Sequence, residues 1–463
     1  MKKTVEWGLV LIVAGSVLAF GGVQPYAYSA MEAALFLLAA VVLIRQTSEG
    51  KIDLLLPLWI LPFLGLVLFQ TIPLPGRLES WLSPNRLFTG LQATLAPGAT
   101  HWATLSLYPH DTLLGFFKLA AYLAAFVLAA YAFEPRESKN ILAPGLIVLG
   151  SLEAAYGIVQ YLTGYQKIFA YTKQFYTEDA TGTYINHNHY AGFLELVLPF
   201  AAMMVFYSLQ PRPVRGAPER GRARADGNSL SLDPRILFYA FIVVLLLIAI
   251  VFSRSRMGIF SVLVSLILMA LLGQLGEGRR AWMVITLLVI AGAMTYAIWI
   301  GIDPVMKRFE ALTPSGLENP YARVAIWKQA SGILRDYPAL GSGLGTFQVA
   351  FRRYQTSSLD VHIDHAHNDY LEVATDTGMV GALLLFIPIL GLLVKMILAY
   401  IGARSAYRRS VLLACIGSTA ALLVHSIMDF NLQVPANALL FAVVLGLGYK
   451  ATYSTAASWR TTA

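Results

Sequence analysis

The sequence has little charge for its length. Charged residues make up 13% of the 463-residue chain, whereas a soluble globular domain carries about a quarter. Apolar side chains account for 57% of the residues. This composition excludes water as the main solvent of the chain and favours a membrane protein.

The sequence has one cysteine, and its basic residues do not gather in a pattern that would form one basic surface. The one cysteine, Cys415, lies in an apolar run and has no second cysteine to pair with, which excludes a disulfide framework within the chain. The formal net charge is +8, but lysines and arginines flank apolar runs instead of lining one surface. We therefore expect no nucleic acid among the partners.

Apolar runs long enough to cross a bilayer are what the chain has in excess. A helix needs roughly 20 mostly apolar residues to span the hydrocarbon core, and such windows recur along nearly the whole length. The sequence predicts an all-α, polytopic integral membrane protein with about twelve transmembrane helices. The predicted spans begin near Trp7, Tyr28, Asp53, Thr112, Ile141, His189, Ile236, Met257, Ala281, Thr375, Val411 and Gln433.

The basic residues also predict orientation. If the amino and carboxyl termini are cytoplasmic, every short inner turn holds at least two lysines or arginines, as cytoplasmic loops usually do. All eight histidines then fall in outer loops or at outer helix ends. The polar chemistry is therefore predicted at the extracytoplasmic face.

The chain divides into three predicted regions. Residues 1–301 hold helices 1 to 9, with outer loops at 71–111 and 163–188 and a disordered basic inner loop at 210–235. Residues 302–374 form a large outer loop between helices 9 and 10, which we expect to be ordered because it contains aromatic residues and a helical pattern. Residues 375–463 hold helices 10 to 12.

The densest polar segment, residues 362–372, has the sequence HIDHAHNDYLE and ends the large outer loop. A neutral imidazole can accept a proton from a hydroxyl at ordinary pH, because its unperturbed pKa lies near 6.5. We predict a general base here. Two alternatives stay open: simple helix initiation, with capping-box spacing from Asp369 to Glu372, and a metal site made of the three histidines with Asp364 or Asp369.

Two further segments suit an anionic lipid. Arg254 and Arg256 lie in a short outer turn between strongly apolar runs, where planar guanidinium groups can grip a phosphate. Residues 323–334 have the pattern of an amphipathic surface helix, on which Arg323 and Trp327 share one stripe. The alternatives are snorkelling of the arginines to headgroups and plain interfacial anchoring of the helix. The glycine-rich segment 338–347 is expected to be a flexible turn that closes this helix.

Polar clusters at 186–190 and 425–431 also lie at predicted outer helix ends. Amide, imidazole and aromatic side chains suit hydroxyl-rich sugars, and they equally suit helix capping.

Taken together, these segments resemble the O-antigen ligase and O-antigen polymerase family of membrane glycan transferases. The resemblance covers the second half of the chain well, and the order, spacing and membrane side of its motifs agree. It rests on Ser255-Arg256-Met-Gly258, on Arg323 with Trp327 and the following glycine turn, and on His367-Asn368-Asp-Tyr-Leu371 with Gly378 beyond.

The resemblance implies transfer of a glycan from an undecaprenyl diphosphate donor to a sugar hydroxyl on lipid A-core or a similar acceptor. It implies no metal or cofactor, and a periplasmic site in the bacterial inner membrane. By position, His367 would be the base, with His365 as its alternative, and Arg256 and Arg323 would hold the diphosphate, with Arg254 as the alternative to Arg256. Glycan contact or support is expected from Asn186, His187, Asn188, Trp327, Asn368, Asp369, Tyr370 and Asp429.

Other functions remain open at this level. A polymerase would use the growing glycan as acceptor, and a protein O-oligosaccharyltransferase of the same family would use a Ser or Thr side chain. A flippase for lipid-linked oligosaccharides belongs to a different class. Transporters usually carry ionisable groups near the bilayer midplane and internal repeats, and neither stands out in this sequence.

Overall fold

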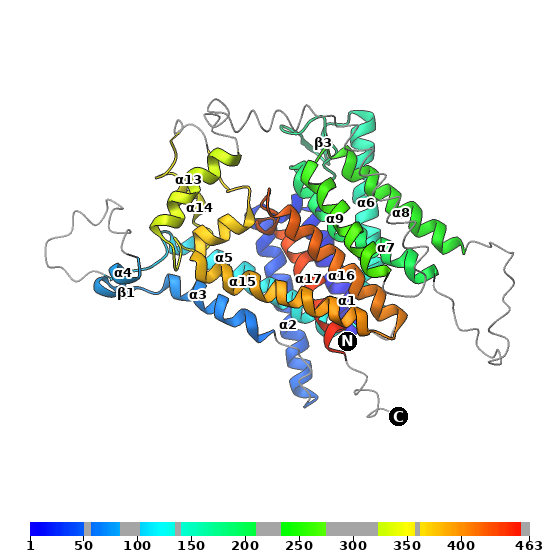
Figure 1. Cartoon of the computed structure of the whole chain (residues 1–463), viewed down its shortest axis with the longest axis horizontal. Helices are drawn as coiled ribbons and strands as arrows, with labels where there is room; N and C mark the ends of the chain where they lie inside the picture. Colours follow the sequence, from blue (N-terminus) through cyan, green and yellow to red (C-terminus); the bar gives the residue numbers. More distant parts are fainter. Residues whose placement is uncertain are drawn as a thin grey trace.

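Long helices make up most of the structure, a computed structural model that describes residues 1–50, 57–83, 102–134, 140–209, 233–274, 323–356 and 362–454. Within these ranges, nine helices are long and apolar enough to cross a membrane (Figure 1). They are α2 (Pro25–Ser48), α5 (Pro109–Ala132), α6 (Leu142–Thr163), α7 (His187–Leu209), α8 (Pro234–Phe252), α9 (Arg256–Gly273), α15 (Asp369–Gly402), α16 (Ala406–His425) and α17 (Pro435–Tyr453).

Two shorter helices overlap two more of the predicted spans. These are α1 (Lys2–Leu18) and α3 (Leu61–Thr71), which follows a 3-10 turn, η2 (Leu58–Ile60). The span predicted from Ala281 and most of the basic loop 210–235 lie outside the described residues. The all-α polytopic class is therefore confirmed, while the count of twelve and the orientation stay predictions.

The remaining elements are small and lie between the long helices. Three are short helices: α4 (Gly76–Leu82), α13 (Arg323–Asp336) and α14 (Phe347–Phe351). Two are antiparallel strand pairs, β1 (Leu74–Pro75) with β2 (Trp102–Ala103) and β3 (Lys167–Ile168) with β4 (Tyr171–Thr172). Two are 3-10 turns, η1 (Phe20–Gly22) and η5 (Asn431–Gln433).

Helices α7, α16 and α17 form the centre of the bundle. Between 72% and 83% of the residues in their most apolar windows are buried, against 22% in α2 and α8 at the periphery. Because lipid is as apolar as leucine, close packing and hydrogen bonds must hold such helices together. Gly417 of α16 provides a close contact and a hydrogen bond to α9. It packs against Met269, and its carbonyl oxygen accepts a hydrogen bond of 2.8 Å from Ser265 Oγ.

The glycine turn at 338–347 is fixed against α15. Gly341, Gly343 and Gly345 all adopt positive φ, and the Gly343 and Gly345 amides donate to the Asp376 carbonyl and carboxylate at 2.8 and 2.7 Å. Gln70 at the end of α3 donates to the Asp376 carbonyl at 2.9 Å. The predicted flexible turn is therefore tied to two helices by hydrogen bonds.

Helix α15 begins at Asp369, earlier than the span predicted from Thr375. A kink at Gly378, where φ is 68° and ψ is 177°, separates the first turns of α15 from the rest of the helix and explains the difference between the observed and predicted starts. The first turns, 369–377, are helical and largely buried in the protein, and the long apolar part follows the kink. The last residues of the predicted loop 302–374 therefore belong to this helix.

Substitution of Gly378 should destabilise the fold. Only glycine adopts this backbone conformation readily, and a Cβ would overlap the Ala339 carbonyl oxygen in the glycine turn. We expect Gly378→Ala to lower the free energy of unfolding by about 1–3 kcal/mol. Gly391 of α15 is the matched control, since a Cβ there meets open space and alanine favours a helix. Thermal unfolding of both variants in detergent checks this, and equal stability would contradict it.

Candidate functional site

Polar side chains from helix ends far apart in the sequence meet at one end of the bundle. The contributing segments are the beginnings of α7, α9, α13 and α15, the residues just before α15, and the turn from α16 to α17. Figure 1 shows α13 and α14 beside the beginning of α15. One carboxylate in the α16–α17 turn connects most of these segments.

That carboxylate belongs to Asp429, which is fully buried. Its Oδ2 lies 3.5 Å from the Arg323 guanidinium at the beginning of α13. Its Oδ1 lies 3.6 Å from His189 Nε2 and 4.0 Å from His367 Nδ1, and it accepts the Phe430 backbone N–H at 2.8 Å. A single buried anion is therefore faced by three nitrogen-bearing side chains from three segments.

The surroundings keep Asp429 ionised. Burial alone would raise the pKa of this carboxyl, but the nearby imidazole of His189 and the positive charges of His425 and Arg323 outweigh burial and lower that pKa well below its usual value. A buried pair interacts electrostatically with this carboxyl, in which His425 Nδ1 is 3.0 Å from Glu195 Oε2. Asp429 is therefore a fixed negative charge that faces His189, Arg323 and His367.

His367 is held in an unusual backbone conformation, with φ at 50°. Left-handed φ at a residue other than glycine is uncommon and clusters at functional sites. Its Nδ1 faces Asp429, so Nε2 lies at the opposite edge of a ring that is 34% exposed. Burial lowers the pKa of His367, and the nearby Asp429 charge offsets only part of that effect. At neutral pH this imidazole is therefore neutral and able to accept a proton.

His365 is arranged differently. Its Nδ1 lies 2.7 Å from Glu372 Oε1, and the other Glu372 oxygen accepts the Ala366 backbone N–H at 2.8 Å. Burial would lower the pKa of His365, but the charge and hydrogen bond of Glu372 raise it overall. A raised pKa leaves less of the His365 imidazole in the neutral form that accepts a proton, so the lowered pKa of His367 favours His367 over His365 for that role.

Arg254 and Arg256 also differ in their contacts. Arg254, with φ at 57°, lies 3.2 Å from Glu178 and 3.4 Å from Asp179, both in the 163–188 loop. Arg256 begins α9 with an exposed side chain and has no carboxylate within ion-pair distance in the described part of the chain. Arg256 is therefore the arginine free to bind an added anion, whereas Arg254 joins the loop to the α8–α9 turn.

The 163–188 loop also makes contacts through His187, the first residue of α7. Its Nδ1 lies 2.5 Å from the Ser253 carbonyl oxygen and 3.3 Å from Asp179, and its ring stacks on Tyr176 at 4.4 Å between centroids. Asn186 accepts the Asn188 backbone N–H at 2.8 Å and so caps the helix. The 186–190 cluster thus places the arginine turn beside the Asp429 group.

Several residues predicted to touch the glycan have structural contacts. Trp327 donates through Nε1 to the Ala366 carbonyl at 2.9 Å and so fixes the backbone next to His367. Asn368, and not Asp369, caps α15 by accepting the Leu371 N–H at 2.9 Å. The Asp369 carboxylate accepts from Ser426 Oγ, and the Tyr370 hydroxyl donates to the Leu423 carbonyl, both at 2.7 Å. These contacts support roles in building the site, and their contact with glycan stays a prediction.

The three histidines of 362–367 face three different carboxylates. His362 lies 2.6 Å from Asp364, His365 is bound to Glu372, and His367 faces Asp429. In the described segments, no group of three or more His, Cys, Asp or Glu side chains is arranged to hold a metal ion. The proposed metal set is therefore not assembled by these residues.

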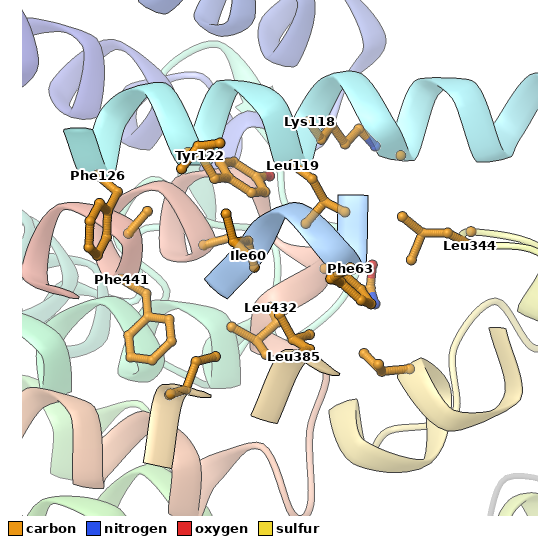
Figure 2. Close-up of a pocket in the computed structure, with 18 of the residues that line it drawn as sticks. Ile60, Phe63, Lys118, Leu119, Tyr122, Phe126, Leu344, Leu385, Leu432 and Phe441 are labelled. Atoms are coloured by element: carbon orange, nitrogen blue, oxygen red, sulfur yellow. The ribbon is translucent and has the colours of Figure 1, made fainter. Parts of the chain in front are cut away.

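The structure also holds an apolar pocket of about 360 Å³, which Figure 2 shows. Helices α3, α5, α15 and α17 line it, and Leu432, in the same turn as Asp429, forms part of its wall. Lys118 contributes a cation, which sits over the Tyr28 ring at 4.1 Å. Since its lining runs from Asp111 near the beginning of α5 to Phe126 well along it, the pocket extends down the helices away from the site.

Four participants were not found from the sequence: Phe430, Glu372 as the partner of His365, and Tyr176 and Asp179 in the 163–188 loop. Phe430, Tyr176 and Asp179 belong to no recognisable local pattern, and Glu372 was named only for its capping-box spacing, so their contacts with histidine rings emerge only in the fold. His189 was named only within a cluster, although it faces Asp429 directly.

These features define a class: a multi-pass α-helical membrane protein with a charged, histidine-rich site at one end of its bundle. A family model described as O-antigen ligase matches residues 241–386, which include both arginine positions, Trp327 and the His362–His367 segment. The match confirms the resemblance to that family over this part of the chain and supports a membrane glycosyltransferase of O-antigen ligase or polymerase type. A comparison with curated proteins gave no match.

Proposed function

We propose that this protein transfers a glycan from an undecaprenyl diphosphate donor to a sugar hydroxyl of an acceptor such as lipid A-core, at the periplasmic face of the bacterial inner membrane. One observation carries the proposal. His367, a neutral base, and Arg323, a fixed cation, both face the buried Asp429 carboxylate, at 4.0 and 3.5 Å. Proton acceptance and anion stabilisation are therefore available side by side, as displacement of a diphosphate requires.

His367 supplies the base. Asp429 favours the tautomer that carries a proton on Nδ1, which leaves the Nε2 lone pair to accept the proton of the acceptor hydroxyl. The 4.0 Å separation is too long for a hydrogen bond, and such contacts commonly shorten when substrate binds. The hydroxyl oxygen then attacks the anomeric carbon as the bond to the diphosphate oxygen breaks, and the configuration at that carbon inverts.

The arginines stabilise the leaving group. Undecaprenyl diphosphate departs as an anion, and preorganised donors aimed at developing charge are worth about 3–4 kcal/mol each. Arg256 is exposed and has no carboxylate partner in the described residues, so its fork of donors is available. Arg323 is 29% exposed, with Asp429 on one side only, and can face both the base and the diphosphate.

The apolar pocket supports a lipid-linked substrate. Its walls are hydrocarbon except for a few polar groups such as Lys118, and pockets of roughly 300–1,000 Å³ are the usual size for ligand binding. Leu432 forms part of its wall and lies in the turn that carries Asp429. A prenyl or acyl chain in this pocket would bring its head group to the polar site.

The first test is transfer of a labelled undecaprenyl diphosphate glycan by the purified protein. We expect His367→Ala to lower the transfer rate by about 10²-fold or more, because a positioned base contributes 10²- to 10⁴-fold. His362→Ala is the matched control and should transfer at the wild-type rate, since His362 is exposed and bonded to Gln348 and Asp364. Undiminished turnover by a folded His367→Ala protein would remove His367 from the mechanism.

The second test separates the two arginines. Arg256→Ala should lower kcat/KM for the donor by about 10²-fold, whereas Arg254→Ala should cost far less, because exposed ion pairs contribute about 1 kcal/mol or less. Steady-state kinetics with varied donor concentration distinguishes them. A larger loss in Arg254→Ala than in Arg256→Ala would assign the diphosphate to Arg254.

A further inference from the structure

Phe430, next to Asp429 in the α16–α17 turn, contacts three histidine rings from two other segments. The His365 ring stacks on it, with centroids 4.1 Å apart and planes 20° from parallel. The rings of His189 and His367 meet it edge to face, at 4.6 and 4.9 Å. No other described aromatic ring contacts more than one histidine. A single phenyl group therefore sits between the proposed base and two other imidazoles.

The same residue also fixes the carboxylate that faces the base. Its backbone N–H donates to Asp429 Oδ1 at 2.8 Å, the oxygen that lies nearest His367 Nδ1. The backbone of Phe430 thus constrains Asp429, and its side chain constrains His367, which are the two partners of one interaction. His365 cannot turn away from the phenyl ring, because Glu372 holds its Nδ1 at 2.7 Å.

We propose that Phe430 is a positioning residue for His367: its ring fixes the direction of the imidazole and keeps water from the space between His367 and Asp429. The proposal rests on the proposed function, in which His367 is the base. It explains how an imidazole whose Nδ1 has no hydrogen-bond partner among the described residues stays oriented. It also divides the roles of the histidines, since His365 supports the phenyl ring while His367 faces substrate.

The proposal predicts a change in titration. His367 is faced by Asp429 and Glu372, which favour its protonated form, and by Arg323 and His365, which oppose it. Burial is the largest influence and lowers the pKa of His367. Removing the phenyl ring admits water, which relieves part of the burial effect, so the pKa should rise toward about 6.5. Since the base acts when neutral, the acid limb of the rate profile should then move to higher pH.

The experiment compares Phe430→Leu with Phe430→Tyr, which keeps the ring. Phe430→Leu should lower kcat by on the order of 10- to 100-fold, with little change in the donor KM, and should shift the acid limb upward. Phe430→Tyr should restore most of the rate. Phe386→Leu is the matched control, because Phe386 is a buried aromatic on α15 that packs on Tyr370 and on no histidine ring of the described segments. Wild-type kcat and an unshifted profile in Phe430→Leu would overturn the proposal.

A second readout does not need turnover. Modification of His367 by diethyl pyrocarbonate, followed by peptide mass spectrometry across pH, reports when that imidazole loses its proton. We expect a higher midpoint in Phe430→Leu than in wild type, and equal midpoints would overturn the positioning role. If wild type transfers no glycan, the proposed function fails while this titration still tests the proposal. If Phe430→Leu does not fold, Phe430→Met is measured in the same way.

Discussion

The buried charge of Asp429 is the constraint on which the site depends. A carboxylate without water must be neutralised or multiply bonded, because desolvation of an unpaired ion costs several kcal/mol. Here Arg323, His189 and the Phe430 backbone surround it, and His367 approaches its remaining edge. Drawing these groups to one anion brings together the beginnings of α7 and α13 and the residues before α15. The site is therefore a consequence of satisfying one charge.

The helix bundle makes this possible by placing the α16–α17 turn at the end of two of its central helices. α16 and α17 are among the most buried helices, so the turn that joins them is covered by other segments instead of by solvent or headgroups. The glycine turn and the Gly378 kink then lock the beginning of α15 in place, with Gln70 bonded to both sides of the contact. Rigid attachment matters, because a base displaced by about 1 Å can lose 10²-fold in rate.

Much of this arrangement could be predicted from the sequence, and the limits have physical causes. Apolar runs predicted the spans because hydrophobic length is a local property, and the short α3 was found in the same way. His367, Arg256 and Arg323 stand out as polar groups at helix ends. Phe430 does not, since a phenylalanine in an apolar chain carries no signal until its three imidazole neighbours are seen. Likewise, only the fold shows that Glu372 bonds to His365, or that Arg254 is occupied by the 163–188 loop.

The separation of Arg254 from Arg256, and of His365 from His367, shows what the structure adds. In the sequence each pair consists of like residues two positions apart, and nothing local distinguishes the members. In the fold, Arg254 and His365 are bound by carboxylates of the protein, whereas Arg256 has no carboxylate partner in the described residues and His367 lies 4.0 Å from the nearest one. A guanidinium already paired with carboxylates is the poorer candidate for binding an added anion, and an imidazole whose pKa is raised by a bound carboxylate is the less available base at neutral pH.

The most direct test of this account is glycan transfer by Asp429→Asn, measured together with its thermal unfolding. Asparagine keeps the shape and removes the charge that holds Arg323 and orients His367. The account predicts a loss of about 10²-fold or more in transfer rate with the bundle still folded. Transfer at the wild-type rate by the folded variant would contradict the central role given to this carboxylate.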